Sequence, residues 1–467
     1  MSNRAYKKLL NNSVLFSIGT LGSKLISLML VPIYSYYLTT SEFGTVDILQ
    51  STVSLFIPLV TLCIYQALLR YLLLSNDKKI YTSNAYTLIC TLLTLFIIIG
   101  AICDFIFEIK FYWHFILLLS FEIINTVLSH YARAVNKNII FTLGGIVTTI
   151  SICVGTIIFV IVLKQGAIGY IFGLLIGYLI SNLFYLLTLK PFEFYDIKTV
   201  KSKHMLELIR FSFPLVPNAL MWWFMTASSK YIVLLIFGTD ESGLLASAMK
   251  IPSILTIITA VFINAWQLSA IEESKSDYRS TFYSNVFTYT YIFLSIVSFL
   301  VIACSREIFY YLFDENYYMA WKCVPFSTLA VMFSSLSSFF GAGYVAESKT
   351  KKIMTTSLLA SFINIIFSLL LIPHYGAIGA SISTMIGFII LWIVRMVYFD
   401  IYKEMNVNNI NIIITFSIII IEIVNVIFIN PLYVRTVISI ILLLLLLLHN
   451  LTTLLKLIKW LLSNFCG

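Results

Sequence analysis

Charged residues are scarce in this sequence: they make up 11% of its 467 residues, against about 25% in soluble domains. Hydrophobic residues make up 60%, and the mean hydropathy is +0.97. Apolar stretches of roughly 18 residues or more recur from residue 13 nearly to the end, each long enough to cross about 30 Å of hydrocarbon. The composition therefore excludes a soluble globular fold and indicates an all-α polytopic membrane protein.

The sequence also lacks the motifs of several enzyme classes. It has no CxxC pair and no Cys/His spacing of the metal-binding kind, although it contains 7 cysteines. It has no GxxxxGK[ST] phosphate loop and no HExxH helix. We therefore expect no metal site, no bound cofactor and no nucleotide hydrolysis, and nothing in the pattern of charge indicates a nucleic-acid partner.

The apolar runs divide into about fourteen predicted transmembrane helices, and the charges between them predict their orientation. With the N-terminus inside, 22 of the 30 basic residues fall in cytoplasmic segments and five in external ones. Cytoplasmic loops retain Lys and Arg, so both termini are predicted to be cytoplasmic. The predicted spans lie near 13–37, 46–70, 84–103, 112–132, 139–163, 167–189, 208–237, 243–268, 281–304, 321–345, 353–373, 376–399, 409–429 and 432–450.

Two short motifs occur twice, in the same order and at similar offsets. The tetrapeptide GAIG stands at 166–169 and 376–379, and TxExG stands at 40–44 and 239–243, all at predicted outer helix ends. The repetition predicts two parallel-repeat six-helix lobes around a central cavity, with two further C-terminal helices. The predicted bounds are 1–190 for the N-terminal lobe, 191–206 for a cytoplasmic linker, 207–402 for the C-terminal lobe and 403–467 for the last two helices and the tail.

Three lysines fall inside the predicted spans, together with stripes of polar side chains at helical spacing. A charge at the bilayer centre costs about 2.5 to 3.5 kcal/mol, so we expect such residues to face a wet cavity or a partner. The stripes are also compatible with close helix packing, and a lysine near a helix end can extend to the interface. The candidate cavity residues are Lys24, Lys230, Lys250, Asn218, Trp222, Asn264 and Gln267.

Acids within the predicted spans include Glu122, in the fourth, and Glu422, in the thirteenth. Glu122 fits a proton or Na⁺ coupling site, and it fits equally well as the neutralising partner of a lysine. The sequence therefore leaves open whether a proton or Na⁺ gradient drives the protein.

Four segments, at 19–47, 214–238, 250–273 and 343–380, carry a family resemblance. The most specific pieces are KIP…AWQLSA in the third segment and LIPHYGAIGA in the fourth. These segments resemble polysaccharide flippases of the bacterial O-antigen and capsule type, within the multidrug/oligosaccharidyl-lipid/polysaccharide exporter superfamily.

The resemblance implies a function. It implies a transporter, not an enzyme, that moves undecaprenyl-diphosphate-linked oligosaccharide repeat units from the cytoplasmic to the outer leaflet of the bacterial cell membrane. It implies membrane lipids and other polysaccharide assembly proteins as partners. Relatives often carry Asp-Arg where this chain has Ser229-Lys230, which keeps the cation and removes an acid. Aromatic residues suited to stacking on sugars are Trp222, Trp223, Trp266 and Tyr34.

Two alternative functions remain open. A multidrug cation antiporter of the same superfamily would share the two-lobe architecture but would need acids, not lysines, to face its substrate. An O-antigen polymerase-type membrane enzyme would be expected to have a long external loop, whereas the longest candidate here is the short 305–320 segment.

The distribution of basic residues makes a topological prediction. A membrane-impermeant thiol reagent added to whole cells should label cysteines introduced at 40–44 or 239–243 and should not label cysteines introduced at 191–206. Reporter fusions at either terminus should report a cytoplasmic location. An external C-terminus would contradict the count of fourteen helices.

Overall fold

The computed structural model describes residue 26 and residues 30–74, 77–108, 111–273, 278–347, 349–451 and 453–455. These residues are almost entirely helical and contain no strand. They form two compact units, Met1–Ala227 and Ser228–Gly467, called unit 1 and unit 2 below. Most of the first predicted span, including Lys24, lies outside the described residues. Within the described part of the chain, 11 helices are long and apolar enough to cross a membrane, so the protein is a multi-pass membrane protein.

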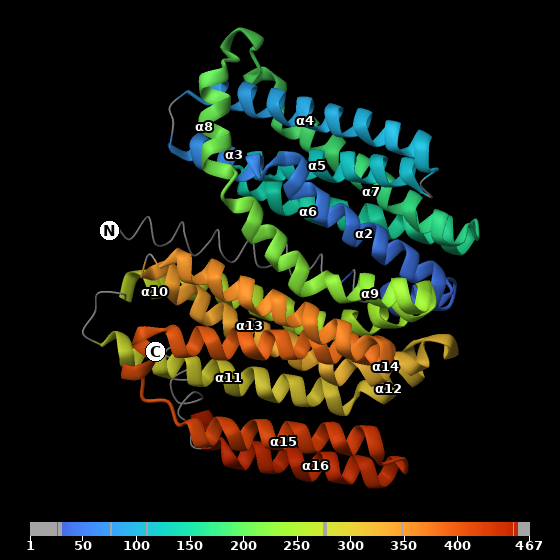
Figure 1. The fold of residues 1–467 in the computed structure, drawn as a ribbon, viewed down its shortest axis with the longest axis vertical. Coiled ribbons are helices and arrows are strands. Elements are labelled where there is room, and N and C mark those ends of the chain that lie inside the picture. Colours follow the sequence, from blue (N-terminus) through green and yellow to red (C-terminus); the bar gives the residue numbers. More distant parts are fainter. Residues whose placement is uncertain are drawn as a thin grey trace. The chain divides into compact units, whose positions relative to one another are not determined.

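Unit 1 contains the helices α2 to α8 and the first part of α9 (Figure 1). Helices α6 and η1, a π-helical turn, form one continuous span, and α8 contacts α3 and α4 at one end of the unit. The elements are α2 (Thr40–Thr61), α3 (Ile64–Leu74), α4 (Lys78–Phe107), α5 (Tyr112–Ala134), α6 (Asn138–Thr156), η1 (Ile157–Val162), α7 (Gly166–Leu189), η2 (Pro191–Phe194), η3 (Ile197–Thr199) and α8 (Ser202–Ser212).

Unit 2 contains the rest of α9 and all later elements. Helices α9 and α14 each contain one residue with non-helical backbone angles, Gly238 and Gly376. Helix α14 covers two predicted spans, whereas α9 covers most of one predicted span and the start of the next, which continues as α10. The elements are α9 (Leu215–Lys250), α10 (Ser253–Glu272), α11 (Arg279–Ala303), α12 (Ser305–Leu312), η5 (Glu315–Cys323), α13 (Val324–Ala346), α14 (Thr350–Tyr398), η6 (Asp400–Glu404), α15 (Asn409–Phe428) and α16 (Leu432–His449).

Proline positions explain several of the helix breaks. Pro58 lies in the last turn of α2, and the chain turns at Leu62 and Cys63, which have φ of 48° and 56°. Pro214 lies between α8 and α9, and Pro252 lies between α9 and α10. Proline removes a backbone donor and clashes with the preceding turn, which accounts for helix breaks near these three prolines.

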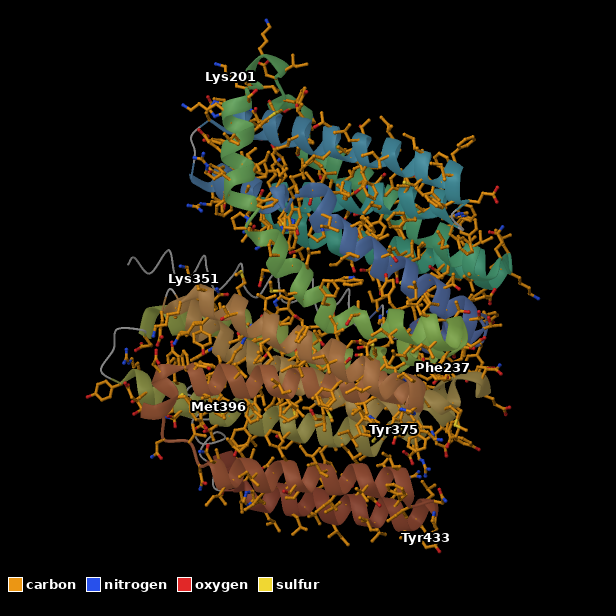
Figure 2. The ribbon with its side chains drawn as sticks, in the orientation of Figure 1. Lys201, Phe237, Lys351, Tyr375, Met396 and Tyr433 are labelled. Carbon is orange, nitrogen blue, oxygen red and sulfur yellow. The ribbon has the colours of Figure 1, made fainter. Side chains whose placement is uncertain are left out.

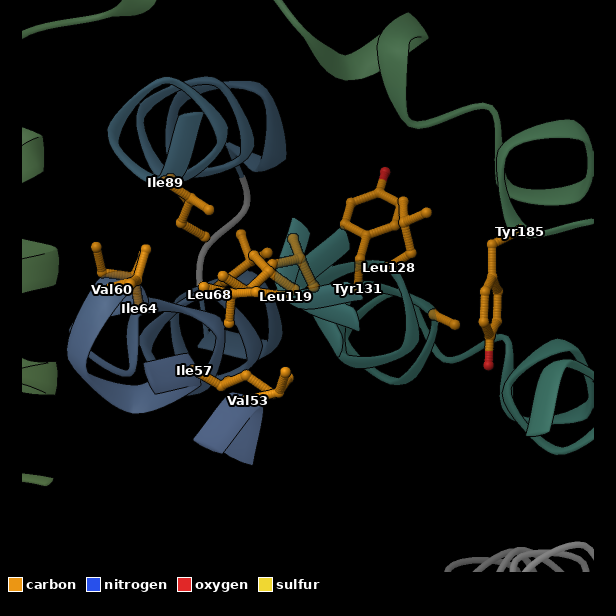
Figure 3. Packing of buried hydrophobic residues seen from close by; sticks show 14 of the residues in the cluster. Val53, Ile57, Val60, Ile64, Leu68, Ile89, Leu119, Leu128, Tyr131 and Tyr185 are labelled. Atoms are coloured by element: carbon orange, nitrogen blue, oxygen red, sulfur yellow. The ribbon is translucent and has the colours of Figure 1, made fainter. Parts of the chain in front are cut away.

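The core of unit 1 lies where α2, α3, α4, α5 and α7 meet (Figure 3). Lipid tails are as apolar as leucine, so close packing rather than exclusion from water holds such helices together. Glycine allows the closest approach: a Cβ on Gly173 of α7 would lie 2.6 Å from the backbone nitrogen of Thr156 in α6. The cluster includes Val53, Ile57, Val60, Ile64, Leu68, Ile89, Leu119, Leu128, Tyr131 and Tyr185.

A glutamate caps the turn that begins α7 in unit 1. Gly166 starts the helix with φ of +56°, and the next N–H, that of Ala167, donates to Glu42 Oε1 at 3.3 Å. Glu42 Oε2 accepts from the backbone N–H of Thr39 at 2.9 Å, which completes a capping box at the start of α2. One side chain thereby ties the start of α2 to the start of α7.

The same arrangement recurs in unit 2. Gly376 has φ of +55°, and the backbone N–H of Ala377 donates to Glu241 Oε1 at 3.0 Å. Phe237 and Tyr375, next to these turns, lie at one end of the unit, and Lys351 lies at the other (Figure 2). The two motifs that repeat in the sequence therefore meet pairwise in each unit, which confirms the two parallel-repeat lobes.

Helices α15 and α16 form a hairpin after the two repeats, held by a buried polar network. Glu422 of α15 is fully buried; Ser439 Oγ of α16 donates to its Oε1 at 2.6 Å, and Asn425 Nδ2 donates to its Oε2 at 3.2 Å. Asn425 also donates to the backbone oxygen of Arg435 at 3.2 Å. Glu422 is thus a packing residue that joins the two C-terminal helices.

The capped turn of unit 2 makes a prediction about stability. A Cβ at Gly376 would lie 2.6 Å from Glu241 Oε1, whereas a Cβ at Gly238, which also has positive φ, would meet nothing within 4 Å. Both Gly→Ala changes should cost about 1–3 kcal/mol of backbone strain. Gly376→Ala should cost about 0.5–2 kcal/mol more, because it displaces the cap. Melting temperatures of the detergent-purified variants measure the difference, and equal losses would refute the capping role.

Candidate functional site

A polar cluster lies between α5 and α7 inside unit 1, around Glu122. The Tyr178 hydroxyl of α7 donates a hydrogen bond to the Glu122 carboxylate, and Glu122 is partly buried. A tyrosine is therefore one partner of this acid. The alternative, that Glu122 neutralises a lysine, stays a prediction.

The cluster continues one turn further along both helices. Asn125 Nδ2 of α5 donates to Ser181 Oγ at 2.8 Å and to Asn182 Oδ1 at 3.0 Å on α7. Asn182 Nδ2 donates in turn to the backbone oxygen of Phe121 at 2.9 Å. Thr148 of α6 extends the cluster, with its Oγ1 at 2.6 Å from Ser181 Oγ. Carboxylate, amide and hydroxyl oxygens thus gather within the span, and such oxygens can hold a proton or a hard cation.

Helix α9 carries four of the candidate cavity residues. Asn218 and Trp222 lie one turn apart in the part of α9 that belongs to unit 1, and Lys230 and Lys250 lie in the part that belongs to unit 2. All four side chains are partly buried. Their use in one cavity stays a prediction.

The structure describes the three remaining candidates to different extents. Gln267 lies in α10 and is partly buried. Asn264 lies in the same helix, but its side chain is outside the described part of the structure. Lys24 is outside it altogether.

Two of the candidate tryptophans, Trp266 and Trp223, pack within the protein. Trp266 is buried in unit 2, where its ring stacks on Phe339 at 4.4 Å and its Nε1 donates to the Phe339 backbone oxygen at 3.0 Å. Trp223 donates to the backbone oxygen of Ser51 at 2.8 Å and so anchors α9 on α2. Both tryptophans hold helices together, which leaves Trp222 as the tryptophan of α9 to consider for contact with a substrate.

Hydroxyl groups pack α9 against α14 next to Lys230. Ser229 Oγ lies 2.9 Å from Ser368 Oγ and 3.3 Å from Thr384 Oγ1, and all three residues are buried. Successive residues of an α-helix project about 100° apart. Lys230 therefore projects from a different side of α9 than Ser229, so the small hydroxyls serve packing and leave the lysine on another face.

A buried arginine lies at the end of α14 in unit 2. Arg395 stands in the last turn of this helix and is 1% exposed. Its guanidinium donates to the Ser337 backbone oxygen at 3.0 Å, to Ser357 Oγ at 3.0 Å and to Thr356 Oγ1 at 3.3 Å. These acceptors compensate its burial. The sequence signal for it was an arginine preceded by a long apolar run.

Two repeated helical units with polar and charged side chains inside their spans have the architecture of a parallel-repeat membrane transporter. The profile of a family described as polysaccharide biosynthesis protein matches residues 9–267, more than half of the chain. The chain belongs to this polysaccharide biosynthesis protein family.

Solved structures share the fold at low sequence identity. One is described as the lipid II flippase MurJ in an inward closed conformation; its TM-score is 0.71 at 15% identity, over 94% of this chain and 100% of that chain. Another is an inward-facing multidrug resistance MATE family transporter of the MOP superfamily; its TM-score is 0.60 at 13% identity, over 84% of this chain and 96% of that one. These likenesses show the fold.

A curated relative matches over a shorter stretch. The uncharacterized membrane protein MJ1068 of Methanocaldococcus jannaschii is 33% identical over 113 residues, which are 24% of this chain and 22% of that protein. The matched part thus spans less than a quarter of the relative's length.

Proposed function

We propose that this protein is a flippase that moves undecaprenyl-diphosphate-linked oligosaccharide repeat units from the cytoplasmic to the outer leaflet by alternating access. The family supports a role in polysaccharide biosynthesis. The observation that carries the proposal is the burial of the lysines and of the acid that lie inside the predicted spans of unit 2. Lys230 and Lys250 are only partly buried, whereas the acid Glu422 is fully buried between α15 and α16. An anionic diphosphate suits such lysines.

The proposal includes a place in the cell and partners. The protein acts in the bacterial cell membrane with both termini cytoplasmic, in agreement with the positive-inside rule. Its substrate is the lipid-linked glycan, its surroundings are membrane lipids, and it works beside other polysaccharide assembly proteins. The lipid tail stays in the bilayer while the diphosphate and sugars cross through the wet cavity.

The fold alone does not separate this function from drug export, because flippases and multidrug transporters share it. The charges favour the flippase. A cationic drug would be repelled by lysines in a poorly screened cavity, whereas a diphosphate would be attracted.

We further propose that the Glu122 cluster couples transport to a proton or Na⁺ gradient. Its carboxylate, its tyrosine partner and the adjacent Asn125 amide come from the facing sides of α5 and α7. Uptake or release of one cation at this point would change the hydrogen bonds between the two helices, which is the local change that a gradient-driven transporter needs.

The sign of the substrate charge is tested at Lys250. Lys250→Glu should abolish surface glycan, and Lys250→Gln should reduce it less, because a carboxylate repels the diphosphate while an amide only fails to attract it. Surface glycan and resistance to cationic dyes are measured in the same cells. Lys164→Glu, the same charge change at an exposed loop position, is the matched control and should leave glycan unchanged. Preserved glycan with altered dye resistance in Lys250→Glu would indicate a drug antiporter.

Ion coupling is tested at Glu122. Glu122→Gln keeps the shape and an acceptor for Tyr178, so the protein should fold normally. Transport of lipid-linked oligosaccharide into vesicles should lose its response to an imposed proton or Na⁺ gradient. Glu193→Gln, which neutralises an exposed acid of unit 1, should retain that response. An unchanged response in folded Glu122→Gln would assign this acid to packing alone.

A further inference from the structure

A cavity of ≈ 590 Å³ lies in unit 1 where α3 and α5 end. Its size falls in the range of small-ligand sites, about 300–1,000 Å³. Helix α8 and the first residue of α9 close one side of it. The lining residues are Gln66, Leu69, Arg70, Leu73, His130, Arg133, Phe211 and Leu215.

The cavity lies at the end of unit 1 that the sequence predicts to be cytoplasmic. Helix α3 ends at Leu74, just before the basic pair Lys78 and Lys79, and α5 ends at Ala134, just before Lys137. Basic residues of this kind mark cytoplasmic loops. The cavity is therefore placed at the membrane surface where a lipid-linked substrate made in the cytoplasm would arrive.

The lining is cationic. Arg70 and Arg133 come from different helices, both are exposed, and no Asp or Glu is among the described residues that line the cavity. His130 Nδ1 lies 2.8 Å from the Thr126 backbone oxygen. Since a carbonyl oxygen can only accept, Nδ1 carries the hydrogen and Nε2 remains for another contact. The site thus offers two guanidinium groups and an imidazole.

Aromatic rings position the two arginines. The guanidinium carbon of Arg70 lies 4.3 Å from the centroid of the Phe211 ring in α8, and that of Arg133 lies 5.4 Å from the Phe141 ring in α6. Stacking of this kind restricts the orientation of the guanidinium plane. The arginines are therefore preorganised rather than free to sample many rotamers.

Helix α8 owes its place to hydrogen bonds with α4. The buried Asn84 donates through Nδ2 to the Thr199 backbone oxygen at 3.0 Å and accepts from the Lys201 N–H through Oδ1 at 2.9 Å. Ser83 Oγ accepts from the Asp196 N–H at 2.8 Å. The segment before α8 is thus fixed on α4, and α8 lies beside α3 and α4 (Figure 1). In this position Phe211 of α8 meets Arg70 of α3.

We propose that this cavity is the cytoplasmic docking site for the diphosphate of the lipid-linked substrate; the inference rests on the flippase function proposed above and names a further site for it. A diphosphate offers several oxygens to two arginine forks. The leucines at the rim, Leu69, Leu73 and Leu215, suit the start of the lipid chain. Because Phe211 and Leu215 belong to the segment that leads into unit 2, an occupied site contacts the chain that connects the two units.

Binding to the full-length protein in phosphatidylcholine nanodiscs tests the site. The probe is undecaprenyl diphosphate, without sugar, and native mass spectrometry measures its affinity. Arg70→Gln with Arg133→Gln should weaken binding roughly tenfold or more, since loss of charge-assisted contacts worth about 1.4 kcal/mol gives a factor of ten. Arg210→Gln, which removes an exposed cation of α8 that does not line the cavity, is the matched control and should bind as the wild type does.

A second measurement leaves both arginines in place. Leu73 is 53% exposed at the cavity. Undecaprenyl diphosphate should slow the labelling of Leu73→Cys at that site, and phosphatidylglycerol at equal concentration should slow it less. Equal protection by phosphatidylglycerol would make the cavity a general phospholipid contact and overturn the proposal, as would unchanged affinity in the folded double variant.

Binding and transport separate the two proposals. If the arginine variants bind as the wild type does while Lys250→Glu still blocks glycan export, the docking site is wrong and the flippase function stands. If the wild type binds undecaprenyl diphosphate through the arginines while Lys250→Glu leaves export intact, the docking site stands and the charge argument for the flippase cavity fails.

Discussion

A chain that turns at the edge of hydrocarbon must find partners for the free N–H groups at the start of the next helix, because lipid offers none. In both units a glutamate does this. Glu42 accepts from Ala167, and Glu241 accepts from Ala377, beside glycines whose φ is positive. The carboxylate also places negative charge at the positive end of the helix dipole. These two contacts join the repeated TxExG and GAIG segments at one end of each unit.

Much of the fold could be predicted from the sequence because its signals are strong and local. Apolar runs match the spans, prolines match the breaks near Pro58, Pro214 and Pro252, and the repeated TxExG and GAIG motifs predict two like units. The direct pairing of Glu42 with Gly166 could not be predicted. The two segments are more than 120 residues apart, and neither motif indicates that the acid of one contacts the glycine turn of the other.

The candidate site was harder to predict, because a polar residue in a span looks the same in sequence whether it faces water or a neighbouring helix. Trp266 was expected to suit stacking on sugars, yet it stacks on Phe339 inside unit 2, and Ser229, beside Lys230, packs against hydroxyls of α14. The hydrogen bonds from Asn125 of α5 to Ser181 and Asn182 of α7 likewise could not be predicted from the sequence. Periodicity identifies a face of a helix, and only tertiary contacts identify what that face meets.

Cations in this protein fall into two physical classes, and the distinction bears on function. Arg395 is almost fully buried, and its guanidinium donates hydrogen bonds to three neutral acceptors. Its N–H groups could contact a ligand only if those hydrogen bonds were broken. Arg70 and Arg133 are exposed, and each lies against an aromatic ring. A guanidinium stacked on a ring keeps its charge and its edge donors. Cations of this second kind, at a helix end beside apolar side chains, are the kind that the proposed docking of a lipid-linked diphosphate requires.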